Sequence, residues 1–355
     1  MQRSHKIKLE PNVAQTIALK KAAGCARYAY NWCLATWTSQ YALSKQGKAE
    51  KPDAYKMSAL WTKCKPDWAY ESPKDASQRA VLNVGTAFHG FWKGLTQFPT
   101  FKRKGRKDSF YVANNRMKVE GYYVHIPVIG LLRMAEKLRF VGKIMSATVS
   151  CEAGDWFISL SMEIPELTPS TNTSIVGVDV GVTNIAVASD GTKIANPRLL
   201  QKYEEKLKRT QKALSRKEKR SRRGEKCILK IQKIHQKIKN VRNDLIHKFT
   251  TELAKNHGLA VIETLDVKGM KEQGKRYMRT AIQDTAMREV HRQLEYKMRT
   301  AKAPAFYRSS KTCSSCGRVV DNIVDWHTFR CECGHVQDRD DNASFNLRNM
   351  RWVTP

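Results

Sequence analysis

The sequence predicts a multidomain α+β protein of two or three domains, and three observations lead to this prediction. The chain has 355 residues, 41% of them hydrophobic, which is enough to bury a sizeable core. Helix-type and strand-type patterns fall in separate blocks, with a change of character near Phe98 and a Ser-, Thr- and Pro-rich linker at 165–173. Four of the nine cysteines lie close together near the C-terminus and mark a further small unit.

The N-terminal block predicts one strand and two helices. Alternating residues at 5–9 indicate a short strand. Apolar residues recur at three- and four-residue spacing at 18–34 and again at 75–92, as in amphipathic helices. Three prolines interrupt the stretch between these helices, so we expect 40–75 to be rich in loops.

Strand-type patterns occur in two later blocks. From 98 to 164, β-branched and aromatic residues alternate with polar ones, which predicts a β-rich segment. Residues 175–188 contain two strand patterns separated by a turn, and the apolar run 259–262 indicates a buried strand.

Helical patterns surround that last strand. A long and very basic helical region is expected at 198–257, with a hairpin turn at Gly224. A further helix is expected at 280–300.

The charge balance narrows the class of partner. The chain carries 64 Lys and Arg against 33 Asp and Glu, a formal net charge of +31. Such a surface binds nucleic acid through phosphate contacts and counterion release. The basic residues at 215–226 form either a solvated helix face or a nucleic-acid-facing surface, and their density favours the second. No apolar run reaches the roughly 18 residues of a membrane span, and the first residues lack a signal core, so we expect no membrane and a cytoplasmic location.

The cysteine cluster predicts a structural zinc site. Its members form one Cys-x2-Cys pair and one Cys-x-Cys pair, a pattern typical of tetrahedral thiolate sites with no open position. The expected ligands are Cys313, Cys316, Cys331 and Cys333. His327 and His335 lie nearby, but we expect neither to bind the metal. The other five cysteines are scattered singly, so a disulfide framework is not expected.

Three acidic residues stand in settings that suggest a metal-dependent enzyme. Asp179 and Glu263 each end an apolar strand pattern, and Asp340 opens a helix-like segment. Taken singly, each would more often be a helix cap or a salt-bridged acid. Together they form the kind of carboxylate set that holds two Mg²⁺ ions for phosphodiester hydrolysis. Asp338 and Asp341 are alternatives within the last motif, and Asp338 is a candidate helix cap.

These motifs resemble those of the TnpB family, the transposon-encoded RNA-guided nucleases related to type V CRISPR effectors. The similarity rests on Gly-Val-Asp-Val-Gly-Val-Thr-Asn around Asp179, Val-Ile-Glu-Thr-Leu around Glu263 and Asp-Arg-Asp-Asp-Asn-Ala-Ser around Asp340. It includes Ser-Ser-Lys-Thr-Cys-Ser-Ser-Cys-Gly at the first cysteine pair and extends over nearly the whole chain.

The resemblance implies an RNase H-like RuvC nuclease domain with an inserted zinc ribbon, a β-barrel wedge domain and a helical recognition domain. The implied bounds are 1–10 and 98–170 for the wedge domain, 11–97 for the recognition domain, 171–308 and 335–350 for the nuclease domain, and 309–334 for the ribbon. The segment Met298–Arg308 departs from the family pattern. It is short, and Pro304 lacks the N–H that a sheet ladder uses, so we expect a poor strand there.

The resemblance also implies an RNA-guided DNA endonuclease that cuts double-stranded DNA next to a short transposon-associated motif. Its partners would be a guide RNA from the transposon end and the target duplex, with base pairing supplying the specificity. Asp179, Glu263 and Asp340 would take the three RuvC positions that hold magnesium. The residues implied to contact nucleic acid are Lys74, Gln78, Lys102 and Lys104, of which the first two resemble motif-reading residues.

Three other functions stay open on the sequence. A DNA transposase or resolvase with the same core would act without a guide. A nuclease-inactive repressor would use an RNA guide to bind DNA and would not cut it. An RNA-binding regulator with a zinc ribbon would bind RNA and never cleave. The intact set of three carboxylates argues against an inactive protein.

Overall fold

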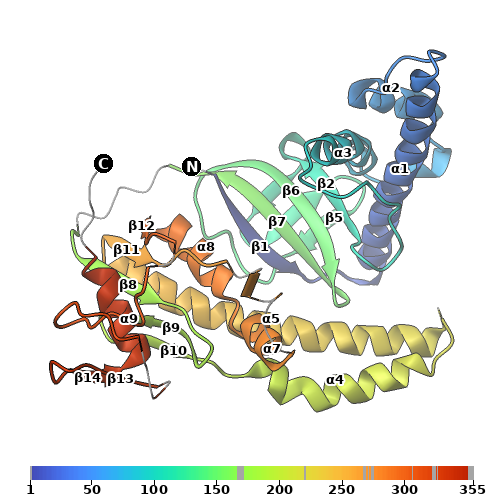
Figure 1. The fold of residues 1–355 in the computed structure, drawn as a ribbon. Helices are drawn as coiled ribbons and strands as arrows, with labels where there is room; N and C mark the ends of the chain where they lie inside the picture. The colour runs from blue at the N-terminus through green and yellow to red at the C-terminus, as the bar shows by residue number, and fades with distance from the viewer. Residues whose placement is uncertain are drawn as a thin grey trace. The chain divides into compact units, whose positions relative to one another are not determined.

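The structure is a computed structural model, and it describes residues 2–165, 172–219, 221–266, 269–270, 272, 276–305, 307–321, 325 and 327–350. Most of the linker expected at 165–173 lies outside these residues. The chain divides into two compact units, 1–166 and 167–355. Each unit has its own hydrophobic core. Each also has its own sheets, whose strands are drawn as arrows in Figure 1.

The first unit begins with a strand and a helical segment. Its elements are β1 (Gln2–Leu9), α1 (Val13–Lys45), α2 (Ala54–Cys64), the 3-10 helix η1 (Asp67–Glu71) and α3 (Lys74–Trp92). Helix α1 starts at a capping box, in which the Asn12 side chain accepts the N–H of Gln15 and the Gln15 side chain accepts the N–H of Asn12.

Helix α2 contradicts the expectation that 40–75 is rich in loops. The Asp53 carboxylate caps this helix by accepting the N–H groups of Tyr55 and Lys56. Met57 and Trp61, four residues apart, point into the core and are almost fully buried. The prolines of this stretch lie outside the helix, so they do not prevent it.

The β-rich segment expected at 98–164 is confirmed. The strands there are β2 (Ser109–Ala113), β3 (Lys118–Glu120), β4 (Tyr123–Ile126), β5 (Gly130–Arg133), β6 (Lys143–Glu152) and β7 (Asp155–Glu163), with the 3-10 helix η2 (Asn114–Arg116) after β2. They form two antiparallel sheets, β1-β7-β6-β2 and β3-β4-β5. Alternate residues of β7 are buried, as expected for a sheet with one face on a core.

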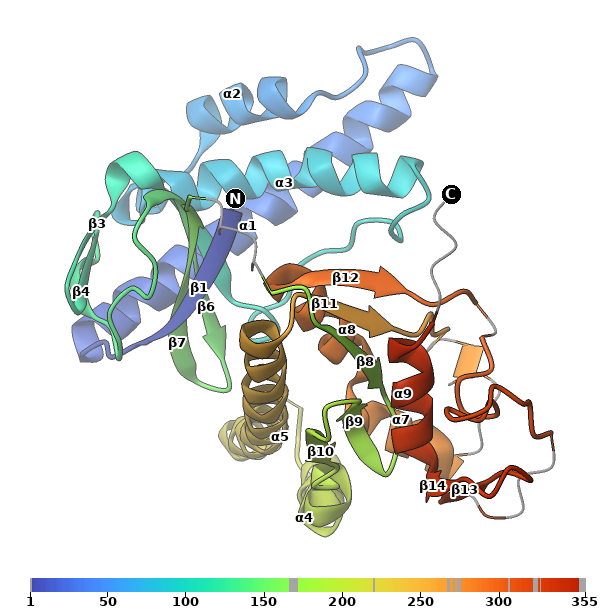
Figure 2. The ribbon, with the colours of Figure 1, turned by 90° about the vertical axis from the view of Figure 1, so that its left-hand side faces the viewer.

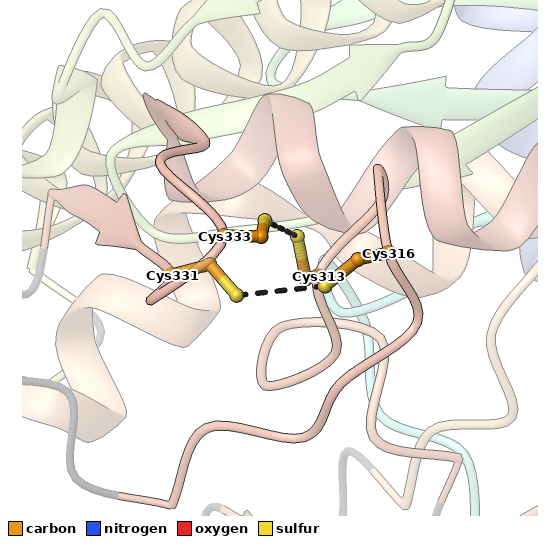
Figure 3. Close-up of side chains that lie close together, drawn as sticks. All are labelled: Cys313, Cys316, Cys331 and Cys333. Carbon is orange, nitrogen blue, oxygen red and sulfur yellow. Dashed lines mark hydrogen bonds between the residues drawn. The ribbon is translucent and has the colours of Figure 1, made fainter.

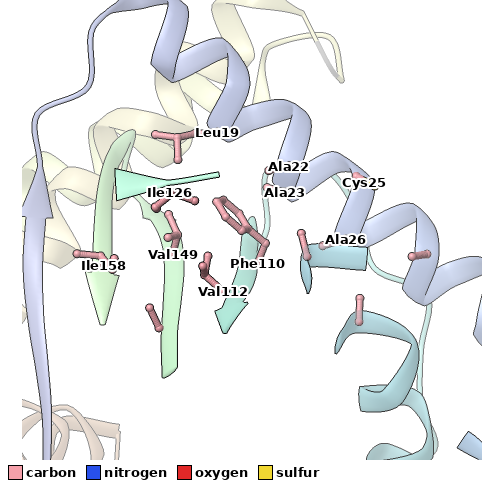
Figure 4. Close-up of a cluster of buried hydrophobic side chains, with 14 of the residues drawn as sticks. Leu19, Ala22, Ala23, Cys25, Ala26, Phe110, Val112, Ile126, Val149 and Ile158 are labelled. Atoms are coloured by element: carbon pink, nitrogen blue, oxygen red, sulfur yellow. The ribbon is translucent and has the colours of Figure 1, made fainter. Parts of the chain in front are cut away.

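Small side chains let α1 pack closely on the sheet. Figure 4 shows Ala22, Ala23 and Ala26 of α1 on the same side of the core as Leu19, with Phe110 and other strand side chains opposite them. All of these residues are nearly or fully buried. Burial of this apolar surface is the main favourable term that holds the helix on the strands.

The second unit is built on a mixed five-stranded sheet. Its strands, in spatial order, are β10 (Lys193–Ala195), β9 (Asn184–Ala188), β8 (Ile175–Asp179), β11 (Leu259–Ile262) and β12 (Arg299–Lys302). Strand β9 is antiparallel to both of its neighbours, β10 and β8, and β8, β11 and β12 are parallel.

Strand β12 forms where we expected a poor strand. Its four residues pair one by one with β11, from Arg299 opposite Leu259 to Lys302 opposite Ile262. The N–H of Ala303 then donates to the carbonyl oxygen of Ile262 at 2.8 Å. Pro304 comes after this last bond, so its missing N–H removes nothing from the ladder.

Helices cover both faces of this sheet (Figure 2). The helices of this unit include α4 (Leu199–Ser215), α5 (Arg222–Asn256), α7 (Arg276–Thr285), α8 (Met287–Lys297) and α9 (Arg339–Arg348), of which α4 packs against α5. Side chains of α5 and α8 share a core with Val176 and Val178 of β8. Leu347 of α9 packs with Val261 of β11 in a separate cluster, because successive strand residues face opposite ways.

Two helix boundaries differ from the sequence prediction. The turn between α4 and α5 lies before Ser221, and Gly224 sits in the first turn of α5, where its N–H donates to the Ser221 side chain. The helix expected at 280–300 is divided into α7 and α8 by Ala286, whose left-handed φ of 51° interrupts it. Neither break has a Gly or Pro signal in the sequence.

Strands β13 (Thr328–Arg330) and β14 (Val336–Asp338) pair antiparallel and lead directly into α9. They carry the second cysteine pair between them. In the part of the chain that the structure describes, every helix is too short or too polar to cross a membrane.

Candidate active site and zinc centre

Two of the three predicted acids lie side by side at one end of the sheet. Strands β8 and β11 are parallel, and Val178 pairs with Ile262, so Asp179 and Glu263 follow in the same register. Both residues share a strand face with Gly177 and Val261, the face on which α9 packs. The carboxyl ends of parallel strands are the usual position of a functional site in an open sheet.

Helix α9 brings the third acid to this edge, and Gly177 allows its close approach. A Cβ atom at position 177 would lie 2.0 Å from the carbonyl oxygen of Ser344 and 2.5 Å from the backbone nitrogen of Arg348. Only glycine leaves room for the helix backbone at this distance. Asp340 sits in the first turn of α9, and its charge acts on Asp179.

The other two carboxylates act on Asp179. Burial, followed by the charges of Glu263 and Asp340, raises the pKa of Asp179 well above its usual value, although Arg339 opposes this. Burial raises the pKa of Glu263 to about 7, against the effect of a hydrogen bond from the Val180 backbone. Negative charge is therefore concentrated here without enough positive charge to balance it, which is the electrostatic pattern of a cation site.

Hydrogen bonds distinguish the acids of the last motif. The Asp338 carboxylate accepts the N–H groups of Asp340 at 3.0 Å and Asp341 at 3.2 Å, which confirms Asp338 as the cap of α9. Asp341 forms an ion pair with Lys193, with 2.6 Å between Oδ2 and Nζ. Asp340 accepts a hydrogen bond from Nδ2 of Asn184 at 3.2 Å. Asp340 is thus the acid of this motif that acts on Asp179.

These residues fit magnesium by their chemistry. They offer only carboxylate oxygens, the donors that Mg²⁺ prefers. Within the described residues, the four cysteines are the group in which three or more ligand atoms lie within 4.8 Å of one another.

The four cysteines form a compact thiol cluster (Figure 3). Sγ of Cys313 lies 3.7 Å from Sγ of Cys333, and Sγ of Cys316 lies 3.6 Å from Sγ of Cys331. Tetrahedral Zn–S bonds of about 2.3 Å require S···S separations of about 3.8 Å. The cluster therefore has the dimensions of a zinc site with four thiolate ligands, and His327 and His335 are outside it.

Each cysteine pair ends in a glycine turn. Gly317 follows the first pair with φ of 77°, and Gly334 follows the second pair with φ of 87°. The N–H of Gly317 donates to the carbonyl of Cys313, and the N–H of Gly334 donates to that of Cys331. The second pair has one residue fewer in its spacer, and its turn is one residue tighter, since its hydrogen bond spans three residues and that of the first pair spans four. A hydrogen bond from the Arg318 backbone is the main cause that lowers the pKa of Cys316 to about 7. Cys333 accepts a hydrogen bond from the His335 backbone, but its hydrogen bonds with the other three thiols raise its pKa to about 12.

The predicted nucleic-acid contacts lie in the first unit. The backbone of Lys102 is fixed by the Asn31 side chain, and its ammonium lies 4.0 Å from the centroid of the Tyr30 ring. Lys102 also lines a cavity of about 1060 Å³ together with four other basic residues, Arg27, Arg103, Arg106 and Lys107. Lys104 is exposed and is not among the residues that line this cavity.

Lys74 and Gln78 occupy the first two turns of α3. They are four residues apart, so they lie on the same helix face. Lys74 is exposed and Gln78 is half-buried, which leaves both able to contact a ligand.

The sequence analysis missed two polar residues near the acids, Asn184 and Asn342. Asn184 begins β9 and contacts Asp340, and Asn342 is a fully buried residue of α9. The sequence indicated both positions only weakly. Asn184 closes the turn after Asp179, and Asn342 follows Asp340 by two residues, but neither spacing specifies a role.

Comparison with known families matches three segments of the chain. Residues 147–274 match a family of the OrfB/IS605 type described as "Probable transposase". Residues 288–347 match the TNB domain of Cas12f1-like proteins. Residues 1–46 match a family described as a helix-turn-helix domain, although here they form strand β1 and the single helix α1.

Individual proteins extend this similarity to almost the whole chain. The protein "Putative RNA-guided DNA endonuclease InsQ" of Escherichia coli K12 is 30% identical over 369 residues, covering 96% of this chain and 90% of the relative. A protein of Streptomyces pristinaespiralis with the same description is 30% identical over 366 residues, covering 98% and 89%. Among solved structures, a CasPhi-2 (Cas12j) complex with crRNA covers 98% of this chain and 97% of its own at 12% identity, with a TM-score of 0.48, too low for any inference.

Proposed function

Because this chain belongs to the TnpB family of RNA-guided DNA endonucleases, we propose that it is a magnesium-dependent RuvC-type nuclease with Asp179, Glu263 and Asp340 as its catalytic acids. One observation carries the proposal. Two carboxylates end adjacent parallel strands in register, and a third acts on one of them, Asp179, from the first turn of α9.

In the proposed mechanism the three acids hold the metal ions, and a different part of the fold keeps each acid in place. When bound, a pair of Mg²⁺ ions would activate the attacking water and stabilise the leaving oxygen of the phosphodiester. Asp179, with the most perturbed electrostatic environment, would hold negative charge between the other two acids. Glu263 is fixed by the end of β11, and Asp340 by the cap of α9 and by Asn184.

The ion pair between Lys193 and Asp341 supports this assignment. It neutralises the acid next to Asp340 and attaches the start of α9 to β10. A free carboxylate at that position would add a fourth negative charge beside the three acids. The pair therefore keeps the excess charge on the residues that would hold metal.

The proposed domain bounds follow from the sheet order. The nuclease domain would comprise 171–308 and 335–350, because the first segment holds all five strands of the sheet and the second supplies α9, which packs on one of its faces. The sheet order β10-β9-β8-β11-β12, antiparallel and then parallel, supports an RNase H-like core. The zinc ribbon would span 309–334, the wedge domain 1–10 and 98–170, and the recognition domain 11–97.

The proposed partners are a guide RNA from the transposon end and a target DNA duplex. Five basic residues around one cavity of the first unit provide a site for backbone phosphates. Exposed Lys and Arg at the turn between α4 and α5 provide a second basic surface. Base pairing would select the target, and the protein would hold the nucleic-acid backbones.

The experiment that tests this function uses protein purified from cells that also express its flanking DNA. With Mg²⁺, the particle should cut a duplex that matches its bound RNA and leave an unmatched duplex intact. Asp179→Ala should retain the RNA and lose cutting. Asp244→Ala is the matched control, because Asp244 is an exposed acid on α5 that forms an ion pair with Lys248.

The other outcomes identify other functions. Cutting without any RNA would support a guide-independent transposase or resolvase. RNA and DNA binding without cutting by the unaltered protein would indicate a repressor, and binding of RNA alone would indicate an RNA regulator.

Reading of the adjacent motif is tested separately. Lys74→Ala and Gln78→Ala should reduce cutting of matched duplexes and change the preference among flanking sequences. Lys104→Ala is the control for loss of one exposed positive charge, and it should weaken binding without changing that preference. An unchanged preference in both α3 variants would remove these two residues from the site.

A further inference from the structure

Asn342 of α9 binds the backbone on both sides of a zinc ligand. Its Oδ1 accepts the N–H of Ser314 at 2.9 Å, and its Nδ2 donates to the carbonyl oxygen of Thr312 at 2.7 Å. Cys313 is the residue between them. Asn342 has no exposed surface, so each of these bonds replaces a contact with water.

Asn346, one turn later, continues the attachment. Its Nδ2 donates to Thr312 at 2.6 Å and to Ser309 at 2.7 Å, in both cases to the carbonyl oxygen. Asn346 is 5% exposed. Two turns of α9 are thus fastened to the segment 309–314 by side-chain amides that can adopt no other partner without leaving buried polar groups unsatisfied.

The same helix carries Asp340, two residues before Asn342. On its other side α9 rests on β8, where the absence of a side chain at Gly177 permits backbone contact with Ser344. The helix is therefore held between the sheet that carries Asp179 and the loop that carries Cys313. The position of Asp340 depends on both supports.

We propose that Asn342 and Asn346 are positioning residues that couple zinc in the four-cysteine cluster to divalent-cation binding at the three acids. Zinc fixes Cys313 and with it the backbone groups of Thr312 and Ser314 to which these amides bind. The fixed loop then holds the first turn of α9 so that Asp340 stays beside Asp179. This inference rests on the proposed function, because it takes the acids to be the cation site.

Mutual coupling follows from this arrangement. If zinc strengthens cation binding, then cation binding must strengthen zinc retention by the same factor. Couplings of this kind commonly change affinity by about 5-fold to 150-fold.

The test uses the full chain without nucleic acid and Mn²⁺ as the probe, with free Mn²⁺ followed by electron paramagnetic resonance. Protein stripped of zinc and then freed of chelator should bind Mn²⁺ at least about fivefold more weakly than zinc-loaded protein. Asn342→Leu should bind Mn²⁺ weakly both with and without zinc, so that zinc no longer changes its Mn²⁺ affinity. Asn349→Leu is the control, because Asn349 is exposed at the end of the same helix and should retain the full zinc effect.

Asp340→Ala separates failure of this inference from failure of the proposed function. Equal Mn²⁺ affinity in Asp340→Ala and in the unaltered protein would overturn the cation site itself. Weaker binding by Asp340→Ala, with no effect of zinc or of Asn342→Leu, would overturn only the coupling. If Asn342→Leu does not fold, hydrogen exchange of the unaltered protein tests the coupling instead. Amides of 339–348 should exchange faster after zinc removal, and equal exchange would overturn the coupling.

Discussion

Asp179 and Glu263 follow directly after Val178 and Ile262, which pair in register on two parallel strands. Two carboxylates are thereby fixed next to each other by the backbone ladder. The raised pKa of both groups results from this placement, with burial as the largest cause in each case. A site of this kind is unfavourable when empty and becomes favourable when a cation binds.

The pH dependence of stability should reveal this effect in metal-free protein. The folded state holds a proton on Glu263 up to about pH 7, whereas the ordinary pKa is 4.5. The stabilisation that this proton gives to the folded state is complete below pH 4.5 and is lost as the pH rises toward 7. The free energy of unfolding should therefore fall by on the order of 3 kcal/mol over this range through Glu263 alone.

Chemical denaturation of the metal-free protein and of Glu263→Gln at pH 4.5, 6 and 7.5 measures that contribution together with the part of the Asp179 shift that Glu263 causes. The remaining titrating groups are common to both proteins. The difference in free energy of unfolding should grow in favour of Glu263→Gln as the pH rises. Parallel pH profiles would show that Glu263 titrates normally.

Asp179→Asn should change stability and metal response in opposite directions. Removing the central negative charge relieves repulsion with Glu263 and Asp340, so the metal-free variant should melt at a higher temperature than the unaltered protein. The unaltered protein should gain about 2.7 kcal/mol when Mg²⁺ is present at a hundred times its dissociation constant. The variant should gain much less and should lose cleavage by roughly a thousandfold or more.

Calorimetry with and without Mg²⁺ provides this comparison, and Asp244→Asn serves as the surface control. A metal-free Asp179→Asn protein that melts below the unaltered one would contradict the repulsion argument. A full Mg²⁺ response in that variant would place the cation elsewhere.

Zinc removal should destabilise the second unit. Cys313→Ser breaks the thiolate set and should abolish retention of one zinc per chain, with a fall in melting temperature. Cys64→Ser is the matched control, because Cys64 is an exposed thiol at the end of α2. Metal analysis and calorimetry of the two variants check this. Retained zinc in Cys313→Ser, or equal loss in both variants, would refute the cysteine site.

The sequence was informative wherever a local pattern decides the structure. Strand patterns ending in Asp179 and Glu263, and paired cysteines, depend on residues close together in the chain. Helix α2 was missed because its evidence is tertiary: Met57 and Trp61 are buried against distant residues, and prolines nearby suggested loops. Strand β12 was misjudged because the effect of Pro304 depends on where the ladder ends.

The supports of the candidate site could not be predicted in the same way. Asn184 and Asn342 act on residues 156 and 28–30 positions away, so no spacing in the sequence indicates their partners. Gly177 is one glycine among 19, and only the packed helix shows why a side chain cannot be added there. Such contacts depend on how α9 lies on the sheet.

Gly177→Ala should therefore displace α9 and with it Asp340. The new methyl group would meet backbone atoms of Ser344 and Arg348, which cannot move aside as a flexible side chain could. Overpacking of this kind commonly costs about 1–3 kcal/mol. Gly24→Ala is the control, because its nearest neighbour would be the Arg27 guanidinium at 3.7 Å and Ala favours the helix by about 1 kcal/mol.

Denaturation and cleavage should be measured together on both variants. In Gly177→Ala, cleavage should fall far more than the folded fraction does, because a shift of the helix separates Asp340 from Asp179 before it unfolds the domain. Gly24→Ala should be as active as the unaltered protein and slightly more stable. Full cleavage by a folded Gly177→Ala protein would mean that close packing of α9 on β8 is not what positions the third acid.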